Sequence, residues 1–110
     1  MDLTAVRAEL EQVVRESDAA IVAFAREDED VDMEEADVSS EITEADREEA
    51  LAEAAEARRE EALAALARLD AGTFGICVDC GTPIVEERLL FRPEAARCLE
   101  DQQRLEEREG

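Results

Sequence analysis

Three cysteines and one aspartate have a spacing that suits a metal ion. Cys77 and Cys80 form a C-x2-C pair, and after an interval of 17 residues Cys98 and Asp101 form a C-x2-D pair. Two such pairs at this separation are typical of four-ligand zinc sites, here with a carboxylate in place of one thiolate. Zinc accepts both donors, so the sequence predicts a structural Cys3Asp zinc site. No open position beside a general base is evident, which argues against zinc catalysis.

Other interpretations of these residues stay open. The three thiols could be reduced and free of metal, or Cys77 and Cys80 could form a redox pair, although no βαβ pattern surrounds them. Asp101 could be a solvent-facing helical carboxylate, which would leave water or no group as the fourth ligand. Asp79 is a less suitable ligand, because residues between the two cysteines of a zinc knuckle usually point away from the ion.

The residues around the two pairs predict how a small finger would fold. Gly81 and Pro83 follow the first pair closely, and small residues let backbone amides turn toward the thiolates. Pro93 is expected to begin a last helix that carries Cys98 and Asp101 on one face. Five apolar side chains between the pairs are expected to pack the finger, namely Ile84, Val85, Leu89, Leu90 and Phe91.

Two long helices are predicted before the finger. Residues 3–26 carry apolar side chains at three- and four-residue steps, and residues 41–70 carry a second, alanine-rich stripe that Arg58 and Arg59 interrupt. The first seam consists of Leu3, Val6, Leu10, Val13, Ser17, Ala20 and Phe24; the second consists of Ile42, Ala45, Leu51, Ala55, Ala62, Leu66 and Leu69. Neither helix can bury its stripe alone, so we expect an antiparallel coiled coil.

The predicted fold is therefore all-α. It consists of an antiparallel helical hairpin over residues 1–70 and a zinc-finger-like module with a C-terminal helix over residues 71–110. Gly72 is the expected cap between the two parts, because glycine readily ends a helix in a left-handed conformation.

An acidic run separates the two long helices. Eight of the eleven side chains in 27–37 are carboxylates and none is basic, so we expect an exposed tip at residues 27–40. Carboxylates suit Mg²⁺ or a basic protein surface, but a merely solvated turn explains the same composition. The ligand spacing of an EF-hand loop is absent from this run.

Composition restricts the partners. The chain has 110 residues and a net charge of −20, with neither lysine nor histidine. This charge argues against direct binding of nucleic acid, which requires neutralisation of phosphates, and against anionic membranes. No signal peptide and no apolar run long enough to cross a bilayer is found, which predicts a cytoplasmic protein. We also expect a monomer, because the two helical seams can pack against each other within one chain. Arg88, Arg92 and Arg97 cluster within the finger, where they could contact a partner or pair with neighbouring glutamates.

Two segments resemble the DksA/TraR C4-type zinc-finger proteins. Residues 70–84, DAGTFGICVDCGTPI, are similar to that family's GxYGxCxxCGxxI motif, and residues 87–98, ERLLFRPEAARC, are similar to its ERLxARPxAxxC motif. This chain departs from the family at Asp101, where the family has its fourth cysteine. The family's tip pattern, Asp-x-x-Asp-x-Ala, is matched in part by residues 34–39, with Glu34 and Asp37 at the acidic positions.

The resemblance implies a function. Members of the family are bacterial transcription regulators that bind RNA polymerase and not DNA. Their coiled coil enters the polymerase secondary channel, acidic tip residues approach the catalytic centre, and some members act with ppGpp. A similar role here would make Glu34 and Asp37 the tip residues, with Arg88 and Arg92 as contacts from the finger, and the protein would not be an enzyme. The alternatives are a zinc-finger module that binds some other protein, or a thiol redox sensor.

Overall fold

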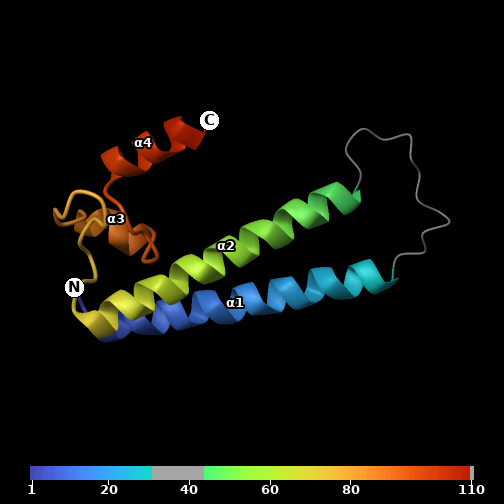
Figure 1. Ribbon diagram of the computed structural model, residues 1–110. Coiled ribbons are helices and arrows are strands. Elements are labelled where there is room, and N and C mark those ends of the chain that lie inside the picture. The colour runs from blue at the N-terminus through green and yellow to red at the C-terminus, as the bar shows by residue number, and fades with distance from the viewer. Residues whose placement is uncertain (31–43, 110) are drawn as a thin grey trace.

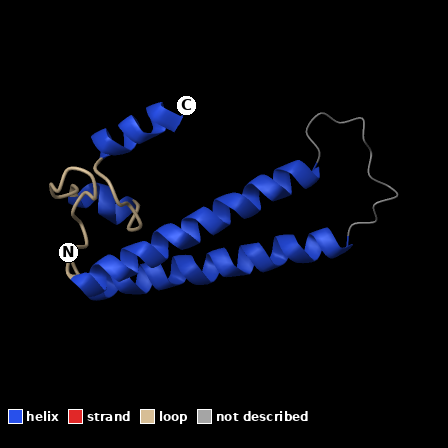
Figure 2. Cartoon of the chain, in the orientation of Figure 1, coloured by secondary structure: helices blue, strands red, loops and turns tan. Residues whose placement is uncertain are grey.

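The computed structural model describes residues 1–30 and 44–109 and confirms the all-α fold (Figures 1 and 2). Four helices occur in these residues: α1 (Leu3–Asp30), α2 (Glu44–Ala71), α3 (Glu86–Phe91) and α4 (Leu99–Glu109). The described part of the chain has no β-strand; a single antiparallel bridge joins Ile76 to Pro83. Among the described helices, none combines the length with the apolar composition that a membrane span requires.

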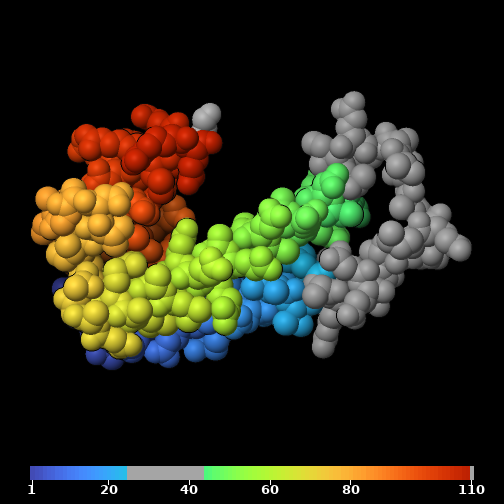
Figure 3. Space-filling view, in the orientation of Figure 1, coloured from blue at the N-terminus to red at the C-terminus, as the bar shows by residue number. Residues whose placement is uncertain are grey.

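Helices α1 and α2 pack side by side as the predicted hairpin, and the remaining elements stand on one end of it (Figures 1 and 3). The finger lies at the end where α1 begins and α2 stops, so the opposite end of the hairpin projects away from it. The molecule is elongated, with extents of 53 × 31 × 20 Å. This arrangement makes the hairpin an arm attached to a compact base.

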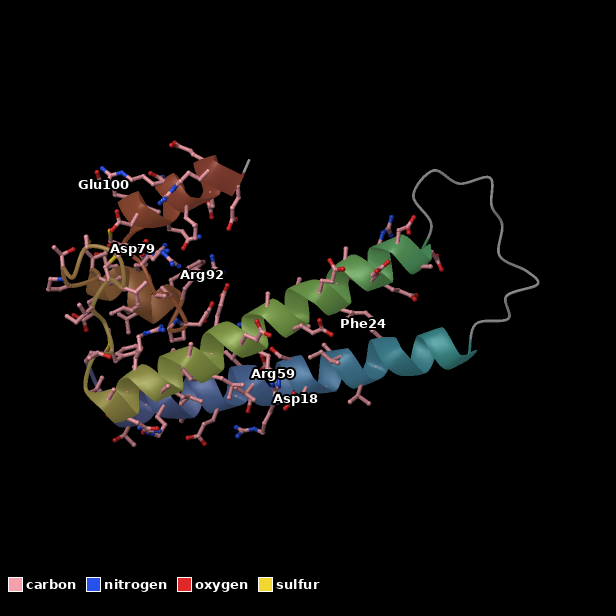
Figure 4. The ribbon with its side chains drawn as sticks, in the orientation of Figure 1. Asp18, Phe24, Arg59, Asp79, Arg92 and Glu100 are labelled. Carbon is pink, nitrogen blue, oxygen red and sulfur yellow. The ribbon has the colours of Figure 1, made fainter. Side chains whose placement is uncertain are left out.

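The hairpin core lies in the half next to the finger. Its buried side chains are Val6, Leu10 and Val13 of α1 together with Ala62 and Ala65 of α2. Ser17, the polar member of the predicted seam, is also buried, whereas Ala20 and Phe24 farther along are only half-buried. Figure 4 shows Phe24 in the space between the two helices toward the far end. Packing therefore weakens from the base of the arm outward.

Three predicted seam positions are wrong. Leu3 is 52 % exposed and Leu51 is 49 % exposed, and Ala45 is exposed as well. Leu3 is the first residue of α1, and the distal half of α2 buries no side chain, since the buried residues of α2 are Ala62 and Ala65. Ile42 lies outside the described residues. Arg59, which interrupts the apolar stripe of α2, forms an ion pair with α1: its Nε lies 2.5 Å from Oδ1 of Asp18 (Figure 4).

The C-terminal end of α2 matches the prediction, whereas that of α1 differs from it. Helix α1 continues to Asp30, so residues 27–30 are helical and the predicted loop begins too early. The acidic run contains neither Gly nor Pro to stop the helix, and Glu is a good helix former. Helix α2 ends as predicted at Gly72, whose φ is +78°. The amide of Thr73 donates to the carbonyl of Arg68, and the amide of Gly72 donates to the carbonyl of Leu69. These two hydrogen bonds form a Schellman cap.

The last helix begins later than predicted. Pro93 does not start it; Pro93 and Glu94 are buried in a turn closed by the amide of Ala95 on the carbonyl of Arg92, at 3.0 Å. Helix α4 begins at Leu99, and its first backbone bond runs from the amide of Gln102 to the carbonyl of Cys98. The residues between Pro93 and Cys98 are not helical and form part of the finger.

The finger has its own small core. Cys77, Ile84 and Leu89 are buried there, with Phe74, Ala95 and Cys98 packed against them. The predicted packing by the other three apolar residues is wrong, since Val85, Leu90 and Phe91 are 66 %, 61 % and 88 % exposed. They flank or belong to α3, a six-residue helix in which Leu89 alone is buried.

Candidate metal centre

The first cysteine pair sits in a tight backbone loop. The amide of Cys77 bonds the carbonyl of Thr82 at 2.8 Å, and the amide of Gly81 bonds the carbonyl of Cys77 at 3.0 Å. Gly81 has a φ of +75°, which side-chain-bearing residues adopt only with strain. The glycine therefore allows the chain to reverse directly after Cys80 and brings both thiols of the pair to the same side.

Two features place Cys98 and Asp101 beside the first cysteine pair: a backbone hydrogen bond before Cys98 and the start of α4 directly after it. The amide of Val78 bonds the carbonyl of Ala96 at 2.9 Å, which ties the loop to the segment before Cys98. Cys98 immediately precedes α4, and Asp101 lies in its first turn. Residues three apart at a helix start can point to one side, so the predicted pairing of Cys98 with Asp101 survives although the helix begins later than expected.

The four predicted residues form one cluster. The Sγ atoms of the three cysteines and a carboxylate oxygen of Asp101 all lie within 4.8 Å of one another. Sγ of Cys80 lies 3.9 Å from Sγ of Cys98, and Sγ of Cys77 lies 3.1 Å from Oδ2 of Asp101. Two thiolates bound about 2.3 Å from a tetrahedral zinc ion would lie about 3.8 Å apart. The donor set and its spacing therefore fit zinc.

Burial differs among the four residues. Cys77 is 2 % exposed and Asp101 is 7 % exposed, whereas Cys98 is half-buried and Cys80 is exposed. Within the described residues, Asp101 is one of only two buried carboxylates, the other being Glu94. A carboxylate is buried in proteins when a partner compensates its charge, and this observation argues against the alternative that Asp101 merely faces solvent.

The surroundings shift the pKa values of the cluster in different directions. Burial raises the pKa of Cys77, but backbone N–H groups, foremost those of Cys80 and Cys98, outweigh it and bring the pKa below its usual value. Hydrogen bonds from the thiols of Cys80 and Cys77 lower the pKa of Asp101.

The pKa of Cys98 shifts upward. The backbone N–H of Asp101 acts to lower the pKa of Cys98, but burial and hydrogen bonding to the neighbouring side chains outweigh this effect and raise the pKa to about 11. A metal must therefore displace a proton from Cys98 at neutral pH.

Two neighbours of the cluster escaped the sequence analysis. The hydroxyl of Thr82 lies 2.9 Å from Sγ of Cys80, and Nη1 of Arg104 lies 3.3 Å from Oδ1 of Asp101. Arg104 follows Asp101 by three residues, a spacing that is visible in the sequence and that places both on one face of a helix. Asp79 pairs with Arg97 at 2.6 Å and is not part of the cluster, as expected.

The other predicted site residues lie apart from the cluster. Nε of Arg88 donates to the carbonyl of Arg97 at 3.0 Å, and Nε of Arg92 lies 3.4 Å from Oε1 of the buried Glu94. Both arginines line a shallow hollow between the finger and α2, which also includes Glu61 and Arg97; Figure 4 shows Arg92 on the side of the finger that faces α2. Glu34 and Asp37, the predicted tip residues, lie outside the described residues, and their role stays a prediction.

Comparison with known proteins agrees with this geometry. Residues 72–107 match the prokaryotic dksA/traR C4-type zinc finger. The structure of transcription factor DksA2 from Pseudomonas aeruginosa is similar over 96 % of this chain and 84 % of its own, with a TM-score of 0.74 and 32 % sequence identity. No curated protein sequence matches the chain. The zinc-finger match and the Cys3Asp cluster together indicate that the protein binds zinc. The chain belongs to the DksA/TraR family.

Proposed function

We propose that this protein is a transcription regulator that binds RNA polymerase through its secondary channel, as a monomer and without contacting DNA. The observation that carries the proposal is the joint match of finger and arm, since the similarity to a transcription factor extends over 96 % of the chain and not over the finger alone. The net charge of −20 supports a protein partner over a nucleic-acid partner, because phosphate binding requires cationic side chains.

In this proposal Cys77, Cys80, Cys98 and Asp101 are the zinc ligands, and the ion has a structural role. Four protein donors leave no position for a substrate or an activated water, so the protein acts by binding and not by catalysis. The ligands come from a loop and from the start of a helix that are about twenty residues apart in sequence. Their shared ion would hold the finger closed.

The base of the arm has contacts that fix its direction relative to the finger. Phe74 packs against both the hairpin core and the finger core. Nη2 of Arg68, on α2, donates to the carbonyl of Ala95 in the finger at 3.5 Å, and burial followed by the nearby charge of Arg97 lowers the pKa of Arg68. The finger would dock on the polymerase, with Arg88 and Arg92 as contacts. The contacts of Phe74 and Arg68 would then set the direction of the arm relative to the docked finger.

The acidic tip would act at the far end of the arm. Glu34 and Asp37 are the residues that the proposal places near the polymerase catalytic centre, where carboxylates can interact with Mg²⁺ or with basic channel walls. The tip would thus influence transcription, whereas the finger and the base of the arm would supply binding.

The experiment is retention of core RNA polymerase by the tagged protein, with a known secondary-channel factor as competitor. Binding should be lost to the competitor. The double variant Glu34→Gln and Asp37→Asn should still bind but should change transcription in vitro less than the wild type does. The matched control replaces the exposed Glu9 and Glu11 of α1 by glutamine and should behave as wild type. Binding that the competitor does not displace would contradict the secondary-channel proposal.

Arg92→Gln tests the finger contact, with Arg108→Gln on the exposed face of α4 as control. Weaker polymerase binding by Arg92→Gln alone would support the contact. Equal binding by both variants would remove Arg92 from the interface.

A further inference from the structure

The two oxygens of Asp101 face different partners. Oδ2 accepts a hydrogen bond from Sγ of Cys77, one of the three clustered thiols, at 3.1 Å, whereas Oδ1 lies 3.3 Å from Nη1 of Arg104. The side chain of Asp101 is 10 % exposed and that of Arg104 is 62 % exposed. The carboxylate is therefore held between a buried thiol on one side and a guanidinium at the surface on the other.

Arg104 is itself fixed by a second carboxylate. Its Nη2 lies 2.6 Å from Oε1 of Glu100, one helical turn earlier, while its Nη1 reaches Asp101. The planar fork of an arginine can engage two carboxylates at once, which the single ammonium of a lysine cannot do with the same geometry. Glu100 thus aims the guanidinium at the outer oxygen of Asp101.

We propose that Arg104 is a positioning residue of the zinc site, which keeps Asp101 a ligand through Oδ2 alone. The inference rests on the proposed ligand role of Asp101. A carboxylate can bind zinc through one oxygen or through both, and the guanidinium occupies Oδ1. With only one oxygen free, Asp101 takes the place that a thiolate occupies in a four-cysteine site, and the ion stays four-coordinate.

The charge of the site gives a second reason for this arrangement. Three thiolates and one carboxylate carry more negative charge than one zinc ion neutralises, and the chain around them is strongly acidic. Arg104 places a cation directly behind the carboxylate. Outer partners of this kind orient metal ligands, and their loss typically lowers metal affinity about 10- to 100-fold. An ordinary exposed ion pair would leave metal affinity unchanged.

The test compares Arg104→Gln with Arg108→Gln, which removes the same charge one turn farther along α4. Zinc affinity is measured by competition with a chromophoric chelator, and the geometry of the site is measured by the visible absorption of the Co²⁺-loaded protein. Arg104→Gln should bind zinc about tenfold more weakly. Its Co²⁺ bands should lose intensity, because the freed oxygen raises the coordination number above four. Arg108→Gln should match wild type in both measurements.

Two further variants separate the possible failures. Arg104→Lys keeps the charge but not the fork, so it should not restore the wild-type Co²⁺ spectrum; full restoration would overturn the positioning role. Asp101→Ala should change the Co²⁺ spectrum. If it does and Arg104→Gln equals Arg108→Gln, the inference about Arg104 is wrong and Asp101 is still a ligand. If Asp101→Ala leaves the spectrum unchanged, the ligand proposal fails as well. Circular dichroism of each variant verifies that α4 is retained.

Discussion

The carboxylate oxygen Oδ2 of Asp101 lies 3.1 Å from Sγ of Cys77, across a sequence separation of 24 residues. Both side chains are buried, at 7 % and 2 % exposure, in a finger that has only three buried side chains in its apolar core. A core this small contributes little stability by itself, and the structural role that we propose for the metal rests on this observation.

The first prediction concerns replacement of Asp101. Asp101→Cys supplies a fourth thiolate and should retain zinc longer than wild type when a chelator is added, because zinc binds thiolate more strongly than carboxylate in such sites. Asp101→Ala should lose zinc fastest. Metal release is followed by absorbance of the chelator complex. Identical release rates for wild type and Asp101→Ala would contradict the ligand role of Asp101.

The second prediction concerns pH. The pKa of Cys98 is raised to about 11 in the metal-free protein, so the thiol is protonated at neutral pH and must lose its proton to bind zinc. Zinc affinity should therefore rise with pH and fall on acidification, by about tenfold per pH unit for this one proton. Chelator competition between pH 6.5 and 8.5 measures the slope.

Cys98→Asp is the control for this proton, because a carboxylate is already ionised over that range. Its affinity should depend less steeply on pH, by about one proton. An equal slope in both proteins would show that Cys98 does not release a proton on metal binding.

The third prediction concerns the hairpin core. Leu10 is fully buried, so Leu10→Ala should lower the free energy of unfolding by about 2–5 kcal/mol. Leu3→Ala removes the same atoms from a side chain that is 52 % exposed on the same helix and should have less than half that effect. Urea denaturation of the zinc-loaded protein, followed by circular dichroism at 222 nm, measures both. Similar losses of unfolding free energy in the two variants would show that Leu10 does not belong to the hairpin core.

The fourth prediction concerns the joint between arm and finger. Phe74 packs against both apolar cores, and Phe74→Ala should destabilise the protein by about 2 kcal/mol and uncouple the two parts. Hydrogen exchange should increase in both the hairpin base and the finger. Phe91 is 88 % exposed, and Phe91→Ala should change stability by less than about 0.5 kcal/mol. If exchange rises in the finger alone, Phe74 does not connect the cores.

The arm could be predicted where its apolar pattern is strong. Val6, Leu10 and Val13 are buried as their spacing indicates, since large side chains at three- and four-residue steps define one helix face. The stripe of α2 was harder to define, because alanines occur on several faces of that helix; Ala65 is buried and was not identified, whereas Leu51 is exposed. Which alanine faces α1 depends on how closely the helices approach, and sequence spacing does not contain this information.

The metal cluster was predictable because ligand type and spacing are local properties of the sequence. The four residues come together as expected, although the helix that carries Asp101 begins at Leu99 and not at Pro93. The turn at Pro93 is closed by the bond between the amide of Ala95 and the carbonyl of Arg92, and the bond between the amide of Val78 and the carbonyl of Ala96 joins the next residues to the first cysteine loop, a contact between distant parts of the sequence. The contact of Arg104 with Asp101 was missed because many acid–base pairs have this spacing, and only the geometry shows which one lies behind the cluster.

X-ray absorption at the zinc edge of the purified protein measures the number and type of the metal ligands. We expect one zinc ion per chain with three sulfur ligands at about 2.3 Å and one oxygen ligand at about 2.0–2.2 Å, and four sulfur ligands in Asp101→Cys. A protein that contains no stoichiometric zinc, or a zinc ion with fewer than three sulfur ligands, would contradict the claim that Cys77, Cys80, Cys98 and Asp101 together hold the metal.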